Sequence, residues 1–166
     1  MGDQRMKKKE DNEVKSRKIK LDGSVDFDFY VNELQDMIDE EEERLYSETV
    51  RKEYRNPSNI GIIENSDGYA KIQGTCGDTV AMFLKINEGK IENIKYQTDG
   101  CGITVAVNSM LTKLVSKKPL EEAIKISPQY LTDILGGLPE ENLHCAKLSV
   151  MTLQAAIKNY NESQKS

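Results

Sequence analysis

Hydrophobic residues recur at helical spacing through the first patterned part of the chain, residues 27–54. Intervals of three, four and seven positions place them on one side of a helix, and no Pro or Gly interrupts the stretch. The residues concerned are Phe27, Val31, Leu34, Ile38 and Leu45. The pattern therefore predicts a single helix over residues 27–54, which ends before Pro57 because proline cannot continue a helix.

Apolar and polar residues then alternate, which is the pattern of half-buried strands. The alternation covers residues 69–73, 79–86 and 91–96, and residues 61–63 form a further short candidate strand. The turns between the main strands are short and contain Gly, Asp or Asn, so we expect neighbouring strands to be antiparallel.

The period returns to that of a helix from Cys101 onward. Apolar residues predict a buried helix that starts there, short helices over residues 120–125 and 129–135, and a long terminal helix over residues 143–160. Apolar positions lie nearly all round the terminal helix, so it should pack on more than one side. Strands followed by helices are typical of an α+β fold, here a three-stranded antiparallel sheet with helices packed on one face, plus an N-terminal helical extension.

Charge divides the chain into three parts, although the net charge over its 166 residues is only −5. Residues 1–20 carry eight Lys and Arg against four Asp and Glu, whereas residues 21–45 carry ten acidic residues against Arg44 alone. We expect a disordered basic tail over residues 1–24, an acidic helical extension over residues 25–45 and one folded domain over residues 46–162.

Composition argues against several classes of protein. No apolar run approaches the about 20 residues of a membrane span, and no signal peptide is evident. The chain has no Trp and its folded part is neutral, which argues against nucleic-acid binding. Three cysteines are an odd number, which argues against a secreted disulfide framework and favours the reducing cytoplasm.

All three cysteines lie in small, polar, glycine-marked settings, whereas packing cysteines usually have apolar neighbours. The candidate metal ligands are Cys76, Asp78, Cys101, His144 and Cys145. The neighbouring glycines allow the backbone to approach sulfur closely. Cys101 and Cys145 are expected at helix N-termini, where the helix dipole lowers the pKa of a thiol.

The spacing of the cysteines limits the kind of site. They are 25 and 44 positions apart with no Cys-x-x-Cys pair, which excludes a zinc ribbon and a ferredoxin-type cluster. Three thiolates with a harder oxygen ligand would hold an iron–sulfur cluster loosely, which suits a protein that gives its cluster away. The residue types alone leave open a second interpretation, in which the cysteines are inert thiols and the aspartate and histidine are ordinary turn and surface residues.

At these residues the chain resembles the IscU/NifU-type iron–sulfur cluster assembly scaffold family. The resemblance runs from Tyr46 to Tyr160, and its motifs occur in the family's order. They form an opening segment, three cysteine loops and a closing helix: Tyr46-Ser47 with Asn56-Pro57 and Asn59-Ile60-Gly61, Gly74-Thr75-Cys76-Gly77-Asp78, Gly100-Cys101-Gly102, Leu138-Pro139 with His144-Cys145, and Ala156-Ile157 with Tyr160.

The resemblance implies a scaffold, not an enzyme, on which a [2Fe–2S] cluster is built from iron and desulfurase-derived sulfur and then passed to apo-proteins. By this resemblance Cys76, Cys101 and Cys145 are cluster ligands. Asp78 is the fourth ligand or the residue that makes the cluster labile, with His144 as the competing ligand. Cys145 is also the persulfide acceptor, and the same residues could hold Zn²⁺ tetrahedrally in the apo-protein.

The resemblance further implies partners: a cysteine desulfurase and apo iron–sulfur proteins. Tyr46 matches a tyrosine implicated in desulfurase contact or in self-association as a homodimer. The family's Leu-Pro-Pro-Val-Lys chaperone-recognition stretch reads Leu138-Pro139-Glu140-Glu141-Asn142 here, which argues against docking to a dedicated Hsp70-type chaperone.

Two alternatives to the scaffold remain at this point. One is a protein with a structural or regulatory Zn²⁺ site that partners a cysteine desulfurase. The other is a thiol sulfurtransferase with Cys145 as its persulfide nucleophile.

Overall fold

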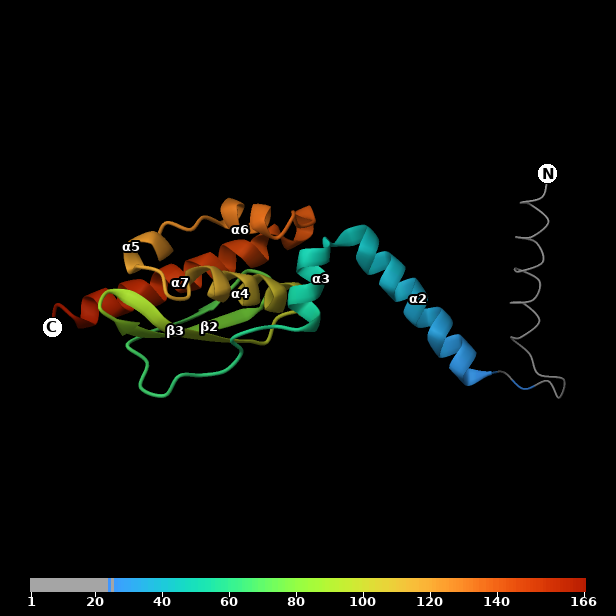
Figure 1. Cartoon of the computed structure of the whole chain (residues 1–166), viewed down its shortest axis with the longest axis horizontal. Coiled ribbons are helices and arrows are strands. Elements are labelled where there is room, and N and C mark those ends of the chain that lie inside the picture. The colour runs from blue at the N-terminus through green and yellow to red at the C-terminus, as the bar shows by residue number, and fades with distance from the viewer. Residues whose placement is uncertain (1–23, 25) are drawn as a thin grey trace. The chain divides into compact units, whose positions relative to one another are not determined.

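The computed structural model describes residue 24 and residues 26–166 (Figure 1). The basic tail expected over residues 1–24 falls almost wholly outside the described residues, so it stays a prediction. The chain divides into two units, residues 1–44 and residues 45–166, and each is described by itself. Among the described residues, no helix combines the length and the apolarity needed to cross a membrane.

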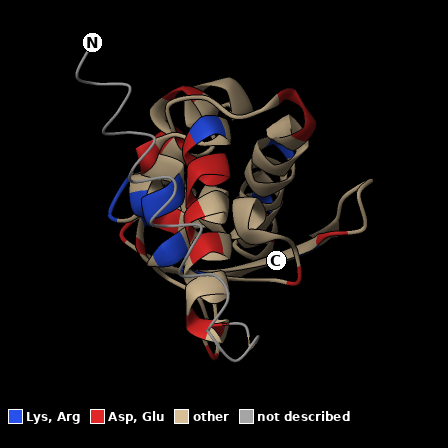
Figure 2. Ribbon diagram, turned by 90° about the vertical axis from the view of Figure 1, so that its right-hand side faces the viewer, with Lys and Arg blue, Asp and Glu red and all other residues tan. Residues whose placement is uncertain are grey.

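The helix α2 (Phe27–Leu45) belongs to the N-terminal unit and is rich in acidic residues, which follow one another along it in Figure 2. None of its residues is buried. The prediction of one helix over residues 27–54 is wrong, because a second helix, α3 (Glu48–Arg55), begins separately. Ser47 adopts an extended backbone and its side chain accepts a hydrogen bond from the Val50 amide at 3.1 Å, which caps the N-terminus of α3.

The sheet is a meander of three antiparallel strands, β1 (Gly68–Gln73), β2 (Thr79–Asn87) and β3 (Lys90–Thr98), in the order β1-β2-β3. The predicted strands and their antiparallel pairing are confirmed. The candidate strand over residues 61–63 is wrong. In that region only Ile60 pairs with the sheet, through an isolated parallel bridge to Tyr96.

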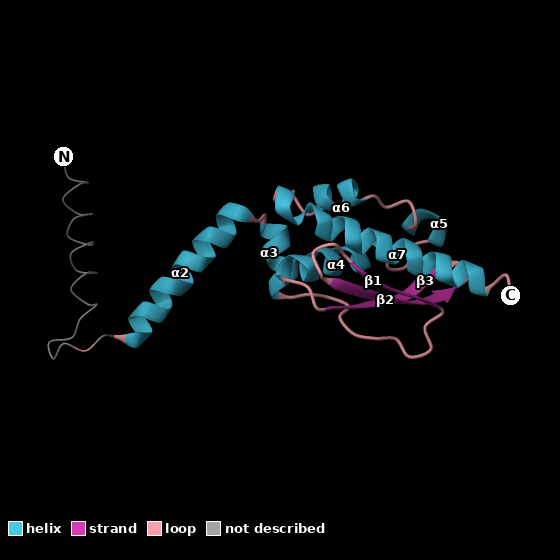
Figure 3. Cartoon of the chain, turned by 180° about the vertical axis from the view of Figure 1, so that it is seen from behind, coloured by secondary structure: helices cyan, strands magenta, loops and turns pink. Residues whose placement is uncertain are grey.

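The helices that follow the sheet lie where the sequence predicts them. They are α4 (Gly102–Val115), α5 (Leu120–Ala123), α6 (Pro128–Ile134), a 3₁₀ turn (Glu140–Asn142) and α7 (Leu143–Ser163). Figure 3 shows α4 and α7 on one face of the sheet. There α7 packs along β1 and β2 and α4 packs along β3, and both helices also contact each other and α6. The predicted α+β fold with helices on one face is confirmed.

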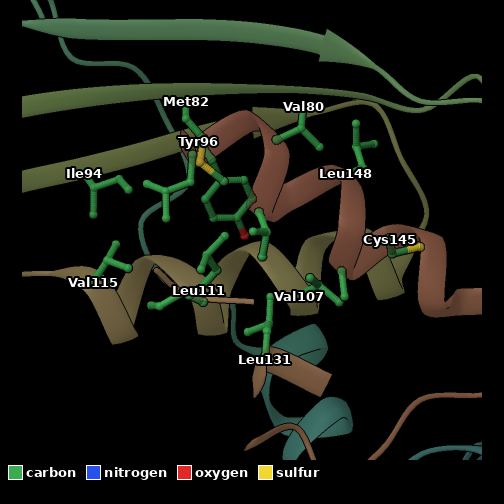
Figure 4. Packing of buried hydrophobic residues seen from close by; sticks show 14 of the residues in the cluster. Val80, Met82, Ile94, Tyr96, Val107, Leu111, Val115, Leu131, Cys145 and Leu148 are labelled. Atoms are coloured by element: carbon green, nitrogen blue, oxygen red, sulfur yellow. The ribbon is translucent and has the colours of Figure 1, made fainter. Parts of the chain in front are cut away.

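The core lies between the sheet and these helices (Figure 4). Alternate residues of β2 and β3 point toward the helices and are fully buried, among them Val80, Met82 and Tyr96. The Tyr96 hydroxyl donates to the Val105 carbonyl of α4 at 3.1 Å, and burial raises its pKa, so it stays a neutral donor. Cys145 lies at the edge of this cluster, so the core extends to the candidate metal ligands.

A buried carboxylate fastens α3 to α4. Glu53 is 3% exposed and accepts hydrogen bonds from Ser109 Oγ and Lys113 Nζ, both at 2.5 Å. Removal of Lys113 would leave the buried Glu53 carboxylate with only the neutral Ser109 hydroxyl as its partner, which is destabilising because a buried charge needs compensation. Glu53 therefore fixes the position of α3 against the C-terminal half of α4.

Candidate metal centre

Three of the predicted ligands meet in one place. One ligand atom each from Asp78, Cys101 and Cys145 lies within 4.8 Å of the other two. We call these three residues the close group. They come from three separate elements: the β1–β2 turn, the N-cap of α4 and the first turn of α7. The structure therefore brings together three of the five candidate ligands from distant segments, and their role as metal ligands stays a prediction.

Two of the three members are placed by core helices. Cys101 is the N-cap of α4, with an extended backbone, and its carbonyl accepts the first helical hydrogen bond from Val105 at 3.1 Å. Cys145 is the third residue of α7 and is 1% exposed. Since α4 and α7 pack against each other and against the sheet, their N-termini are fixed by the core.

The turn between β1 and β2 presents Asp78 to the close group but leaves Cys76 outside it. The Gly74 amide donates to the Asp78 carbonyl at 2.8 Å, and the Gly77 amide donates to the Gly74 carbonyl at 3.1 Å. Gly77 has a φ of +90°, a conformation that favours glycine. Cys76 is exposed at the tip of this turn. It lies near enough for its charge to act on Cys145, but its sulfur is not part of the close group.

The glycines beside Cys101 make room for neighbouring side chains. A Cβ on Gly100 would lie 2.7 Å from Asp78 Oδ2 and 2.8 Å from Thr104 Cβ. A Cβ on Gly102 would overlap the Tyr54 ring of α3. The Gly-Cys-Gly sequence was expected to bring backbone close to sulfur. In the structure the missing side chains instead leave room for two neighbours, because the Asp78 carboxylate packs against Gly100 and the Tyr54 ring packs against Gly102.

Thr104 is a site residue that the sequence analysis missed. Its side chain is fully buried, and its hydroxyl donates to Asp78 Oδ2 at 2.9 Å. The same oxygen lies 3.5 Å from Cys145 Sγ and 3.7 Å from Cys101 Sγ. One sequence feature could have indicated this role: Thr104 is a hydroxyl residue in the first turn of an apolar helix whose N-cap is a candidate ligand, Cys101.

His144 lies beside Cys145, with Nε2 at 3.6 Å from the sulfur. Its side chain is exposed and lies outside the close group. Tyr46 is half-buried, and its hydroxyl donates to Asn142 Oδ1 at 3.4 Å, just before α7 begins. The predicted roles of both residues, as a competing ligand and as a partner contact, stay predictions.

The expectation of a lowered thiol pKa is wrong for Cys145. Burial raises its pKa to about 11, against a smaller lowering by the Thr104 hydrogen bond. The helix N-terminus does not outweigh the loss of hydration in this packed position. Cys145 is therefore a neutral thiol in the apo-protein near neutral pH, and a metal ion must displace its proton on binding.

The donor set suits a thiophilic cation. Two cysteine sulfurs and one carboxylate oxygen are ligands that both Zn²⁺ and iron accept, and a fourth donor completes a tetrahedron. Cys76 and His144 are the two predicted ligands that lie next to the close group and could supply it.

Known proteins are similar to this chain in sequence. Residues 45–166 match the family described as NifU-like N terminal domain. The chain is 38% identical over 117 residues to iron-sulfur cluster assembly scaffold protein IscU 1 of Archaeoglobus fulgidus. The matched region covers 70% of this chain and 76% of that protein. It is also 38% identical over 123 residues to iron sulfur cluster assembly protein 2, mitochondrial, of Saccharomyces cerevisiae. That match covers 70% of this chain and 78% of the yeast protein.

A solved structure supports the fold. The N-terminal NifU-like protein of Brucella abortus superposes with a TM-score of 0.58 over 70% of this chain and 94% of that chain, at 17% identity. The resemblance inferred from the cysteine motifs is confirmed by these similarities. The chain belongs to the NifU-like N-terminal domain family, which includes the IscU-type iron–sulfur cluster assembly scaffold proteins.

Proposed function

We propose that this iron–sulfur cluster assembly scaffold builds a [2Fe–2S] cluster from iron and desulfurase-derived sulfur and passes it to apo-proteins. The observation that carries the proposal is the convergence of Asp78, Cys101 and Cys145 within 4.8 Å at one end of the fold. A scaffold binds its cluster and releases it, so the chain is not an enzyme in the turnover sense.

The cluster is cargo, and four residues are proposed to hold it. Cys101 and Cys145 supply two sulfurs, and Cys76 supplies the third when the β1–β2 turn closes. Asp78 supplies a harder oxygen ligand, which binds iron less firmly than a fourth thiolate and so favours release. His144 is the competing fourth ligand, because its ring lies 3.6 Å from Cys145 Sγ.

Sulfur is proposed to reach the site through Cys145. After losing its proton to solvent, the Cys145 thiolate attacks the outer sulfur of a persulfide on the desulfurase. The new S–S bond forms at Cys145 as the desulfurase S–S bond breaks, and the desulfurase cysteine leaves as a thiolate. Because Cys145 is 1% exposed, this step requires local opening around the N-terminus of α7.

The proposed partners follow from this chemistry. A cysteine desulfurase delivers sulfur and apo iron–sulfur proteins receive the cluster, in the cytoplasm. Tyr46 is the proposed contact with the desulfurase or with a second copy of the chain in a homodimer. A dedicated Hsp70-type chaperone is not among the proposed partners, because acidic residues at Glu140 and Glu141 replace the family's neutral ones.

The position of His144 favours a second candidate function. Together with the close group it offers two sulfurs, one oxygen and one imidazole, which is a complete tetrahedral donor set for Zn²⁺. In that case the protein is a zinc-binding structural or regulatory partner of a desulfurase and carries no cluster.

Anaerobic reconstitution of the full chain with iron and sulfide separates these functions. The scaffold predicts sulfur-to-iron charge-transfer absorption, about two irons per cluster and transfer of that cluster to an apo-ferredoxin. A colourless protein that retains only zinc would contradict the scaffold and support the second candidate. Persulfide on Cys145 without bound metal, found by mass spectrometry after incubation with a desulfurase and cysteine, would instead indicate a sulfurtransferase.

A further inference from the structure

Thr104 lies at the centre of the close group. It is the third residue of α4, and its side chain is fully buried. Its hydroxyl oxygen lies 2.9 Å from Asp78 Oδ2, 3.5 Å from Cys145 Sγ and 3.7 Å from Cys101 Sγ. One hydroxyl therefore contacts every member of the close group.

The hydrogen bond to Asp78 is the strongest of these contacts. A threonine hydroxyl has a single proton to donate, and a carboxylate oxygen is a better acceptor than a sulfur. The bond to Asp78 is also shorter than either sulfur contact. The proton of Thr104 therefore goes mainly to Asp78.

The surroundings of Asp78 explain why such a bond is needed. Asp78 follows the exposed tip of a turn, where Gly77 has open space around it. An aspartate in such a turn can rotate its carboxylate into water. On its other side the carboxylate packs closely against Gly100, where even a methyl group would lie 2.7 Å from Asp78 Oδ2.

We propose that Thr104 is a positioning residue of the metal centre, whose hydroxyl holds the Asp78 carboxylate beside Cys101 and Cys145 before a metal arrives. This inference rests on the proposed function, because it takes Asp78 as the oxygen ligand. A ligand held in place loses little freedom when it binds, so the hydroxyl strengthens metal binding without touching the metal.

The test is a double-mutant cycle on the full-length protein, with Zn²⁺ affinity measured by competition with a chromophoric chelator. The variants are Thr104→Val, Thr104→Ser, Asp78→Ala and Thr104→Val combined with Asp78→Ala. Valine keeps the shape of threonine and removes the hydroxyl, whereas serine restores it. Thr152→Val is the matched control, because Thr152 is a buried threonine of α7 whose hydroxyl donates to the Leu148 carbonyl at 2.8 Å.

We expect Thr104→Val to weaken Zn²⁺ binding by about 10- to 100-fold, as is usual for partners of metal ligands. Thr104→Ser and Thr152→Val should stay within about threefold of the wild type. In the Asp78→Ala background, Thr104→Val should cause less than about a threefold further loss, because the group on which it acts is gone. The Co²⁺ absorption spectrum of Thr104→Val should shift toward that of Asp78→Ala.

Three results would overturn the inference: unchanged affinity in Thr104→Val, an equal loss in the presence and absence of Asp78, or no rescue by serine. If valine prevents folding, Thr104→Ala takes its place in the same cycle. A wild type that binds neither zinc nor a cluster contradicts the proposed function. A wild type that binds zinc while Thr104→Val matches it contradicts only the role of Thr104.

Discussion

The β1–β2 turn and the helix N-termini contribute to the same metal centre in different ways. Cys101 and Cys145 are held by α4 and α7, and Asp78 joins them through the hydrogen bond from Thr104. Cys76 lies only two residues before Asp78, yet it is exposed and stands outside the close group. The comparison teaches that the core holds two sulfurs of the close group in place, whereas Cys76, the proposed third sulfur ligand, lies on an exposed turn outside the close group.

The difference has a physical cause. The helices that carry Cys101 and Cys145 bury long apolar faces against the sheet, so their ends have little freedom. The tip of the turn, residues 75–77, is exposed and is held through Gly74 and Gly77 by a few backbone hydrogen bonds. If the proposed ligand set is right, a metal or cluster meets two sulfurs and one oxygen already in place, and the entropy lost on binding is lost mainly by the turn that carries Cys76.

Removing single cysteines should change Zn²⁺ affinity most, and by different amounts in the two regions. Cys101→Ala and Cys145→Ala should each weaken Zn²⁺ binding by about 1000-fold, since each removes a ligand already in place. Cys76→Ala should weaken it by only about tenfold, because closing the turn offsets part of what its sulfur contributes. Chelator competition measures all three, and an equal loss for Cys76→Ala would show that the turn is already closed in solution.

Thiol labelling should distinguish the same two regions in the metal-free protein. Burial raises the pKa of Cys145 to about 11, and a raised pKa keeps the thiol in its unreactive protonated form. Near pH 8, iodoacetamide should label Cys145 at least about 100-fold more slowly than exposed Cys76. The rate at Cys145 should rise about tenfold per pH unit until the pH approaches its pKa. Equal rates, measured by mass spectrometry of the peptides, would contradict the burial of Cys145.

A matched pair of glycine substitutions should sharpen the comparison further. Gly100→Ala places a methyl group 2.7 Å from Asp78 Oδ2 and 2.8 Å from Thr104 Cβ, so it should displace Asp78 and weaken Zn²⁺ binding by about 10- to 100-fold. Gly77→Ala meets no atom within 4 Å but has a φ of +90°. It should lower the free energy of unfolding by about 1 kcal/mol while leaving Zn²⁺ affinity nearly unchanged. If the two variants lose affinity equally, the turn tip is as important to the centre as the close group.

Deletion of residues 1–24 should change metal binding least. These residues have no core-forming pattern, so Zn²⁺ affinity and the yield of reconstituted cluster should stay within about twofold of the full chain. The same chelator assay and the absorption spectrum measure this. Loss of the cluster in the truncated protein would place the tail in the site.

The sequence predicts the sheet and the helices of residues 68–163 well, because each element combines a clear period with strong turn signals. Gly136 and Gly137, for example, follow α6 with positive φ angles, as a helix end requires. The break between α2 and α3 escaped prediction because the apolar period runs through it, and a capping serine such as Ser47 looks like a serine inside a helix. The apolar residues after Ile60 suggested a strand but form a loop with a single bridge to β3.

The sequence predicts that candidate ligands converge, and the structure brings three of the five together, but the sequence does not show their geometry. Glycine-flanked cysteines mark the loops that meet, because the fold places a turn and two helix N-termini at one end of the sheet. The sequence does not show which thiol the core buries, so the raised pKa of Cys145 reversed the expectation from the helix dipole alone. Thr104 escaped notice because its role depends on a carboxylate 26 positions away.

A crystal structure of the cluster-loaded protein is the most direct test of this account. It should show iron bonded to Cys101 and Cys145 in nearly their present positions, Cys76 drawn in by closure of the turn, and Asp78 as the oxygen ligand still bonded to Thr104. A cluster held by other residues, or one that leaves both Cys101 and Cys145 unbonded, would contradict the account.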